Sequence, residues 1–442
     1  MELFMRYAST IILLCCFTGL DAQNPITPAG RYFADPAAHV RDDGILYLYG
    51  SKDESCNEYC SGSYDVYFTH DMVHWEMAEE VFSSRGINDR VSYNDHVLYA
   101  PDAMENHGAY YLYYCQPDPV AAEGVAISDS PVGPFSAGTR INTYGHEQID
   151  PSVFVDDDGQ AYYLWGQFSL KMARMNPDMI TIDSSTIRDN ILTESRHHFH
   201  EGAFLTRRDD LYYLVYADIS RESKPSCIGY ATAVSPFGPY TYRGVIIDND
   251  GCDPANWNNH GSIAEYLGQW YVFYHRTTHG CQSMRKACVE PIFFNEDGTI
   301  DEVQMTSNGA GPPLPAAEMI GAERACLLHG NVRIEEIAED REALTCIRSG
   351  DRAIFRYISF SGGADSVTVK FRKGPGMARI VIAADKPWHE RLAAITLDES
   401  PASYDWTEAS VPINRVEGNR ELWLLFYGDE KMTLDIDWLY FH

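Results

Sequence analysis

The stretch QIDPSVFVDDDGQAYYLWG, residues 148–166, has the pattern of a β-hairpin introduced by an acidic residue. Asp150-Pro151 indicates a turn, because proline donates no backbone hydrogen bond and keeps the preceding residue out of a helix. The β-rich Ser152–Val155 and the aromatic Ala161–Trp165 flank an Asp-Asp-Asp-Gly sequence whose glycine suits the positive φ of a tight turn. Both flanks are therefore expected to be strands.

The same hairpin pattern recurs along the first 300 residues of the chain. The four further copies are Asp42–Gly50, Asn106–Cys115, Asp209–Ala217 and Leu267–Arg276. The turn positions of the five copies are 51 to 64 residues apart: Gly44, Gly108, Gly159, Asp210 and Gly268. This spacing fits one four-stranded blade per repeat, so the sequence predicts a five-bladed β-propeller.

Polar residues precede these turns at a nearly constant distance. Asp35, Asp150 and Glu201 each lie nine residues before the turn of their own repeat. Asp102 lies six residues and His260 eight residues before theirs. Because blades are arranged radially, equivalent positions lie at one height around the axis. We therefore expect these five side chains to converge at one mouth of the central channel.

A Gly/Pro-rich stretch without strand periodicity, residues 306–316, marks a domain boundary. We place the propeller at residues 23–308, a linker at 309–316 and a second domain at 317–442. Short alternating segments in the second domain are typical of a jelly-roll β-sandwich: 353–360, 366–371, 378–383, 421–426 and 433–441. The predicted fold is all-β, a five-bladed propeller followed by a sandwich.

Residues 1–22 have the pattern of a secretory signal peptide, with Arg6, an apolar run over residues 10–20 and a small residue at Ala22. Cys15-Cys16 leaves a lipid-attachment site as an alternative. No later apolar run approaches the roughly 20 residues of a membrane span. We expect a secreted or periplasmic protein without a membrane span.

The net charge is −30, from 64 acidic and 34 basic residues. Long-range repulsion at this charge argues against nucleic acids, anionic membranes and strongly anionic polysaccharides as partners. A neutral partner is favoured, and we expect a monomer. Most of the 29 tyrosines lie in the strand repeats, where packing between blades is their expected role.

Nine cysteines follow the predicted signal peptide, so at least one is unpaired. Cys56 and Cys60 are close enough in sequence to form a local bridge in an oxidising compartment, and the pairing of the others stays open. No spacing of cysteine and histidine resembles a zinc site, including the run His197–His200.

Five motifs in order carry a resemblance to glycoside hydrolase family 43. They are RYFADP (31–36), LYAPD (98–102), IDPSVFVDDDG (149–159), HFHEGAF (198–204) and NNHGSI (258–263). The resemblance covers residues 24–308 and implies that Asp35 is the general base, Glu201 the general acid and Asp150 the residue that tunes the acid and orients the substrate. It further implies α-L-arabinofuranosidase or β-xylosidase activity on a neutral plant-type glycan, with no cofactor needed for the chemistry.

Three further positions have both a functional and a structural interpretation. Asp102 either supports the substrate site or is structural, and Arg276 either contacts the sugar or steadies Asp35, or else forms a structural ion pair. His260 is either a core histidine or, as the resemblance implies, the residue that holds a structural Ca²⁺ through water. We predict Asp102 and Arg276 as substrate-binding residues and His260 as the metal residue.

The predicted placement of the acids favours hydrolysis with inversion. Residues from blades one and four lie across a channel, which suits the roughly 6.5–9.5 Å between the carboxyl groups of inverting glycosidases. A charged Asp150 beside Glu201 would favour the protonated acid.

Two alternatives stay open for the propeller, an exo-acting galactan hydrolase and a sugar-binding propeller without catalysis. Asp35 argues against the first and the presence of all three acids against the second.

The second domain resembles carbohydrate-binding module family 6, through Gly350-Asp351 before FRYISF and through the closing DIDWLYF. Because the three acids precede residue 308, we expect this domain to fold independently and to contribute affinity for polymer rather than turnover of small substrates.

Overall fold

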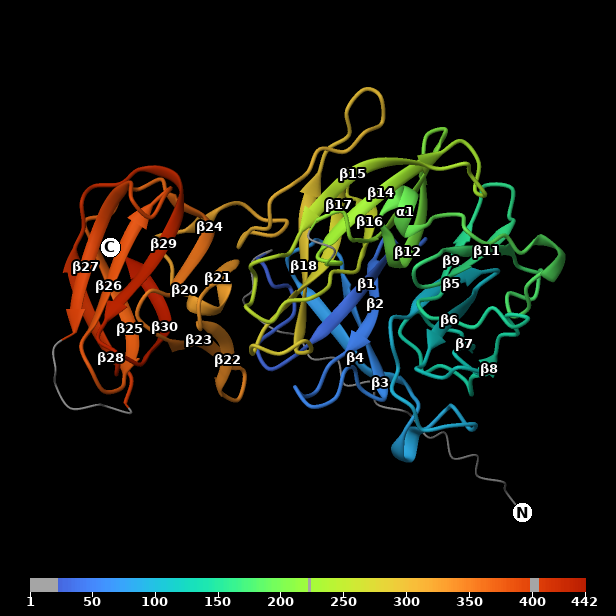
Figure 1. Ribbon diagram of the computed structural model, residues 1–442, viewed down its shortest axis with the longest axis horizontal. Helices are drawn as coiled ribbons and strands as arrows, with labels where there is room; N and C mark the ends of the chain where they lie inside the picture. The colour runs from blue at the N-terminus through green and yellow to red at the C-terminus, as the bar shows by residue number, and fades with distance from the viewer. Residues whose placement is uncertain (1–22, 222–223, 398–404) are drawn as a thin grey trace, which may run out of the picture.

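The computed structural model describes residues 23–221, 224–397 and 405–442 and is built almost entirely of strands. The propeller and the sandwich lie side by side along the longest axis (Figure 1). The predicted signal peptide lies outside the described residues. Among the described residues, no helix is long and apolar enough to cross a membrane.

The first three blades follow the order of the chain. Blade I contains β1 (Phe33–Val40), β2 (Leu46–Lys52), β3 (Ser63–Thr69) and β4 (Trp75–Ser83). Blade II contains β5 (Asp102–Asn106), β6 (Ala109–Cys115), β7 (Glu123–Ser128) and β8 (Thr139–Arg140). Blade III contains β9 (Ser152–Val155), β10 (Ala161–Trp165) and β11 (Lys171–Arg174).

Two more blades complete the propeller. Blade IV follows the short helix α1 (Glu194–His197) and contains β12 (Phe199–Arg208), β13 (Leu211–Asp218), β14 (Cys227–Ala233) and β15 (Thr241–Asp248). Blade V contains β16 (Ser262–Tyr266), β17 (Gln269–Thr277) and β18 (Arg285–Ile292). The prediction of four strands per blade is wrong for blades III and V, which have three each; in blade III isolated bridges, such as Met172 with Arg188, stand beside β11.

The first strands of the blades form a closed ring. β1 contacts β5, β5 contacts β9, β9 contacts β12, β12 contacts β16, and β16 contacts β1. Residues 24–27 run beside β18, where the Ile26 N–H donates to the Ala287 carbonyl oxygen at 2.9 Å. The start of the described chain thus occupies the outer edge of blade V and joins it to blade I.

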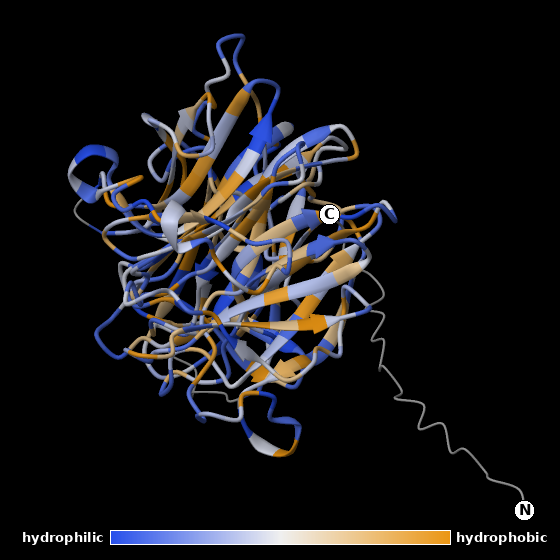
Figure 2. Cartoon of the chain, turned by 90° about the vertical axis from the view of Figure 1, so that its right-hand side faces the viewer, coloured by the Kyte–Doolittle hydropathy of each residue, from blue (hydrophilic) through white to orange (hydrophobic). Residues whose placement is uncertain are grey.

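The space between neighbouring blades is filled by five apolar clusters, one at each junction. Tyrosines are prominent in them, as in the I–II junction where Tyr47, Tyr64 and Tyr114 are buried. Both hydrophobic and hydrophilic residues are found along the strands, as expected where side chains alternate between packed and open positions (Figure 2). Blade packing is therefore the role of these tyrosines, as their position in the repeats predicts.

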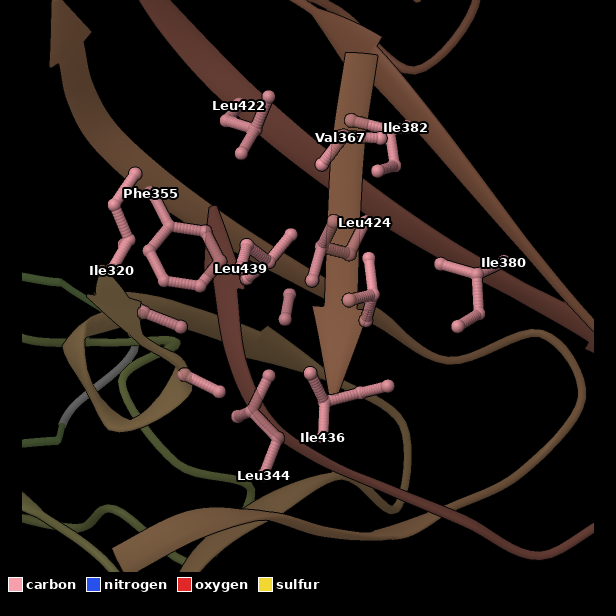
Figure 3. Packing of buried hydrophobic residues seen from close by; sticks show 14 of the residues in the cluster. Ile320, Leu344, Phe355, Val367, Ile380, Ile382, Leu422, Leu424, Ile436 and Leu439 are labelled. Atoms are coloured by element: carbon pink, nitrogen blue, oxygen red, sulfur yellow. The ribbon is translucent and has the colours of Figure 1, made fainter. Parts of the chain in front are cut away.

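The C-terminal domain is a sandwich of two sheets, as predicted. One contains β19 (Leu314–Pro315), β21 (Leu327–His329), β24 (Arg352–Phe360), β26 (Ala378–Ala384), β27 (Glu390–Leu397) and β29 (Gly418–Gly428). The other contains β20 (Ile320–Gly321), β22 (Arg333–Ala338), β23 (Arg341–Ile347), β25 (Ser366–Lys373), β28 (Thr407–Pro412) and β30 (Leu434–Phe441). Side chains from both sheets, including Phe355, Leu424 and Leu439, form its apolar core (Figure 3).

The boundary between the domains is packed rather than open. β19 begins at Leu314, inside the predicted linker, and pairs with β24 of the sandwich. Cys326 of the second domain belongs to the apolar cluster between blades IV and V. The Lys286 ammonium is 2.5 Å from the Glu342 carboxylate, and both side chains are 1% exposed. These contacts join the sandwich to the propeller, while the sandwich keeps an apolar core of its own, and its independent folding stays a prediction.

Candidate active site

The three acids predicted from their spacing line one pocket of about 320 Å³. Asp35 lies on β1, Asp150 lies two residues before β9, and Glu201 lies on β12, so each comes from the inner part of a different blade. All three carboxylates are buried, with 5 to 7% of each residue exposed. The convergence expected from the repeat is therefore present in the structure.

Irregular backbone places these acids. Asp35 has φ 56° and Asp150 has φ 60°, both in the left-handed region that residues other than glycine seldom adopt. The register between β1 and β2 shifts from Ala34 to Ala37, and the register between β12 and β13 shifts on both sides of Glu201. Bulges of this kind turn a side chain out of the ordinary alternation of a strand. Backbone strain of this kind is typical of functional sites.

Asp35 is held by a buried arginine. Arg285, at the start of β18, places Nη1 3.0 Å from Asp35 Oδ1 and binds Asp53 through Nε at 2.9 Å. Ser51 Oγ donates to Asp35 Oδ2 at 2.6 Å, and His275 Nδ1 lies 3.3 Å from Oδ1. Burial alone would raise the pKa of Asp35, but the Arg285 charge and the His275 contact outweigh it and hold this pKa well below its usual range. Asp35 is thus an ionised carboxylate.

The pKa of Asp150, the second acid of the site, is shifted in the opposite direction from that of Asp35. Burial, followed by the negative charges of Glu201 and Asp35, raises the pKa of Asp150 well above its usual range. The Asp150 backbone N–H donates to Cys115 Sγ at 3.3 Å. Asp150 therefore tends to retain a proton where Asp35 does not.

Glu201 is oriented by an amide and lies beside a histidine. Gln167 Nε2 donates to Glu201 Oε2 at 2.7 Å, and His200 Nε2 is 3.9 Å from the same oxygen. Gly202 follows with φ 67°, and a Cβ there would lie 2.7 Å from the ring of His260. The close approach of this backbone to His260 requires glycine.

His260 faces the acids but does not complete a metal cluster. Its Nδ1 is 3.7 Å from Asp35 Oδ1 and 4.0 Å from Asp150 Oδ2. Burial lowers the pKa of His260 despite the nearby Asp35 carboxylate. Within the described residues, no three His, Cys, Asp or Glu side chains are grouped to hold a metal ion. Because Ca²⁺ takes six to eight oxygen ligands and Asp35 is already bound by Arg285, the side chains here do not fit a directly ligated Ca²⁺.

Arg276 does not lie in the pocket, which contradicts its predicted substrate contact. It is 3% exposed, and its Nε donates to Cys288 Sγ at 2.9 Å. Arg276 pairs with Lys286 across β17 and β18, whereas Arg285 pairs with Thr277. Side chains alternate between the two faces of a strand, so Arg276 and Arg285 point in opposite directions. The arginine that steadies Asp35 is therefore Arg285.

Asp102 lies behind the pocket and joins the inner strands. One carboxylate oxygen is 2.5 Å from His39 Nε2 of β1. The other accepts from Ser152 Oγ at 3.0 Å and from the Val153 N–H at 2.8 Å, both on β9. Burial would raise the pKa of Asp102, but His39 and these bonds lower it. The predicted substrate contact of Asp102 is corrected to a structural role between blades I, II and III.

The remaining lining is aromatic and polar. Tyr59, Tyr99 and Trp257 supply apolar ring faces, and Gln167, Asn258 and Gln282 supply amides that can donate to and accept from hydroxyl groups. Sequence reasoning missed Arg285 and Asp53 because neither stands in a repeat motif. Arg285 lies opposite Thr277 only through the register between β17 and β18, which the sequence does not show.

The disulfide also differs from the local bridge considered above. Cys56 is bonded to Cys281, 225 residues away, and joins the loop after β2 to the loop before β18. Cys60 is unbridged and buried, with Sγ 3.2 Å from Arg285 Nη2. Burial raises the pKa of the Cys60 thiol, which makes it an unreactive neighbour of the arginine.

Comparison with known proteins finds glycosidases of the xylosidase and arabinosidase type. A xylosidase/arabinosidase from Thermoclostridium stercorarium is 29% identical, over 93% of this chain and 97% of its own length. A β-xylosidase from Xylanibacter ruminicola is 30% identical, over 55% of this chain and 87% of its own. A family 43 β-xylosidase/α-arabinofuranosidase from a compost metagenome, solved with xylotriose in a calcium-free form, has a TM-score of 0.54 and 28% identity, covering 66% of this chain and 99% of its own.

The likeness extends over both domains. An arabinoxylan arabinofuranohydrolase from Bacillus subtilis shares the fold, with a TM-score of 0.53 at 22% identity over 96% of this chain and 99% of its own. Residues 322–442 match the model for carbohydrate binding module family 6. Residues 22–300 match the model for glycosyl hydrolases family 43, and the chain belongs to that family of glycosidases.

Proposed function

We propose that this enzyme is an exported, inverting glycosidase that releases arabinofuranose or xylose from neutral plant-type polysaccharides or oligosaccharides. The observation that carries the proposal is the pocket in which Arg285 keeps Asp35 ionised while burial and the neighbouring carboxylates raise the pKa of Asp150. Glycoside hydrolysis needs such a division, with one carboxylate as base and one carboxylic acid as proton donor.

The proposed reaction is one displacement. Asp35 takes a proton from a water molecule as the water oxygen bonds to the anomeric carbon. The bond from that carbon to the leaving oxygen breaks, and Glu201 gives its proton to the leaving oxygen. Gln167 orients the Glu201 carboxyl group, and Asp150 lines the same pocket, where it faces the sugar. One proton leaves Glu201 and one arrives at Asp35, so the total charge of the two side chains is unchanged. Exchange of protons with water then returns both side chains to their starting states.

The choice of substrate rests on the pocket and on the relatives. A pocket of about 320 Å³ is at the small end of the range for ligand sites and suits a terminal sugar. The relatives quoted above are named xylosidases and arabinosidases. A net charge of −30 favours an uncharged glycan.

Hydrolysis of a panel of aryl glycosides tests this function. We expect turnover of aryl β-xylopyranoside or aryl α-L-arabinofuranoside. Turnover of aryl β-galactopyranoside in their place would favour the galactan alternative. Binding of xylo-oligosaccharides without turnover of any glycoside would show a sugar-binding propeller instead.

Arg285→Lys is expected to move the acid limb of the kcat/KM profile to higher pH. A lysine ammonium cannot reach Asp35 and Asp53 together as the guanidinium does, so the pKa of Asp35 rises and the base is protonated at a higher pH. The same loss reduces stability above the ordinary Asp pKa of 3.8, where the lowered pKa of Asp35 stabilises the fold. Arg31→Lys, in an exposed pair with Glu79, is the control. An unchanged acid limb in Arg285→Lys would contradict the role of this arginine.

A Ca²⁺ ion held by His260 through water stays a proposal, supported by the calcium-free form named for one solved relative. If it is right, Ca²⁺ added to chelated protein raises the Tm, and His260→Ala removes this shift. The same Tm with and without Ca²⁺ would contradict it.

We also infer export and a monomeric state. Export is supported by the pattern of residues 1–22 and by the Cys56–Cys281 disulfide, which suits an oxidising compartment. Mass spectrometry of the exported product is expected to show a chain that begins near Gln23, and light scattering a single chain. Protein that keeps Met1 in the cytoplasm would contradict export, and twice the mass would contradict the monomer.

A further inference from the structure

The loop between β17 and β18, residues 278–284, forms part of the pocket wall. Its exposed residue Gln282 lines the pocket together with the three acids. The loop ends where Arg285 begins β18 and contacts Asp35. The position of this loop therefore affects a substrate-facing amide and the arginine that steadies the base.

One side of the loop is tied to blade I. Cys281 is bonded to Cys56, and Ser283 Oγ donates to the Ser55 carbonyl oxygen at 2.8 Å. These ties fix the loop to the segment that also carries Tyr59 into the pocket.

The other side of the loop is tied to the sandwich. The His279 N–H donates to the Ile334 carbonyl oxygen of β22 at 2.9 Å. The Arg333 guanidinium packs on Gly280, where an added Cβ would lie 2.6 Å from Nη1. Gly280 has φ 64°, and its N–H donates to the buried Asp253 at 3.1 Å. The sandwich thus covers the back of the loop whose front faces the pocket.

The residue that follows Arg285 on β18 is also bound to the sandwich. Lys286 follows Arg285 and forms the buried ion pair with Glu342 of β23. The Tyr32 hydroxyl, just before β1, donates to Glu336 at 2.6 Å and lies 3.1 Å from Glu342. In Figure 1, β22 and β23 lie on the side of the sandwich that faces the propeller.

We propose that the sandwich is a positioning part of the active site: β22 holds the loop 278–284 and thereby places the Gln282 amide against the hydroxyl groups of a bound sugar. The inference rests on the proposed glycosidase function for its substrate. It assigns Gln282 a binding role and Arg333 a positioning role, and it predicts that the second domain affects turnover of small substrates as well as polymer.

The test uses the full chain and the pair Gly280 and Arg333. Gly280→Ala pushes the loop away from Arg333 and is expected to lower kcat/KM on an aryl glycoside roughly tenfold, mainly through KM, because small misplacements of substrate-positioning groups are costly. Adding Arg333→Ala removes the clash and is expected to restore part of that loss. Gln282→Ala is expected to raise KM about threefold to tenfold by removing hydrogen bonds to the sugar.

Gly268→Ala is the matched control, because Gly268 has φ 80° on the same blade and no atom within 4 Å of an added Cβ. It carries the same backbone strain and is expected to keep the KM of the wild type. The inference is overturned if Gly280→Ala has the kinetics of Gly268→Ala. It is also overturned if adding Arg333→Ala to Gly280→Ala restores none of the lost kcat/KM.

Hydrogen exchange of the loop separates this inference from the proposed function. In Arg333→Ala the peptide containing residues 278–284 is expected to exchange faster than in the wild type, with no change in the hairpin that contains Gly268. Equal exchange of the loop in both proteins would overturn the inference. A wild type that hydrolyses no glycoside would overturn the proposed function, while the exchange result still decides whether β22 holds the loop.

Discussion

Glu201→Gln is expected to lower kcat/KM by about 10²–10⁴-fold on substrates with poor leaving groups, such as xylobiose or an alkyl glycoside. Glutamine keeps the shape of the side chain and its contact with Gln167 but holds no proton that the leaving oxygen can take. An alkoxide leaves slowly without that proton, whereas dinitrophenolate is stable enough to leave unaided. The loss on a dinitrophenyl glycoside should therefore be much smaller.

The comparison of leaving groups makes this prediction specific. Glu105→Gln is the matched control, since Glu105 lies at the end of β5 and does not line the pocket. A uniform loss on all leaving groups in Glu201→Gln would contradict the assignment of Glu201 as the general acid.

Asp35→Asn is expected to lower kcat by about 10²–10⁴-fold on good and poor leaving groups alike. The attacking water is common to all substrates, and an amide cannot take its proton. The variant also leaves the buried Arg285 with one carboxylate partner, Asp53, in place of two. Loss of a buried partner is destabilising, so the Tm should fall as well.

Binding distinguishes loss of the base from loss of the fold. The Asp35→Asn protein should still bind xylo-oligosaccharide or arabino-oligosaccharide, because the rest of the pocket lining is intact. Asp42→Asn, in the exposed turn after β1, controls for the charge change. Activity on dinitrophenyl glycosides close to that of the wild type would rule out Asp35 as the base.

The propeller and the three acids follow from the sequence because both depend on local repeats. A hairpin with its turn glycine is encoded within about 20 residues, and a fixed offset to the turn gives each acid the same height in its blade. Asp35, Asp150 and Glu201 therefore converge as predicted. The sandwich strands are likewise visible from their alternation: β24, β25, β26 and β29 contain the expected segments, and β30 begins one residue after the start of the fifth.

The residues that the sequence did not reveal depend on register and on contacts between distant segments. Arg276 and Arg285 differ in function because β17 and β18 pair in a register that turns them to opposite faces. Cys56 pairs with Cys281 because ring closure brings the loops of blades I and V together. No local pattern encodes either fact.

The contacts across the domain boundary could not be predicted for a related reason. The Gly/Pro-rich composition of residues 306–316 correctly indicates a segment without regular repeats, but composition does not show what packs across it. Lys286 has a buried partner, Glu342, that lies 56 residues further along the chain. That ion pair and the His279–Ile334 hydrogen bond make the second domain part of the pocket's support.

In the proposed reaction, Asp35 activates a water that displaces the leaving group while Glu201 protonates that group. Proton NMR of the first-formed sugar, recorded before mutarotation, tests this most directly. For an aryl β-xylopyranoside the account predicts α-xylose as the initial product, and for an aryl α-L-arabinofuranoside it predicts the β-anomer. An initial product that retains the configuration of the substrate would contradict a single displacement and the assignment of Asp35 as the base.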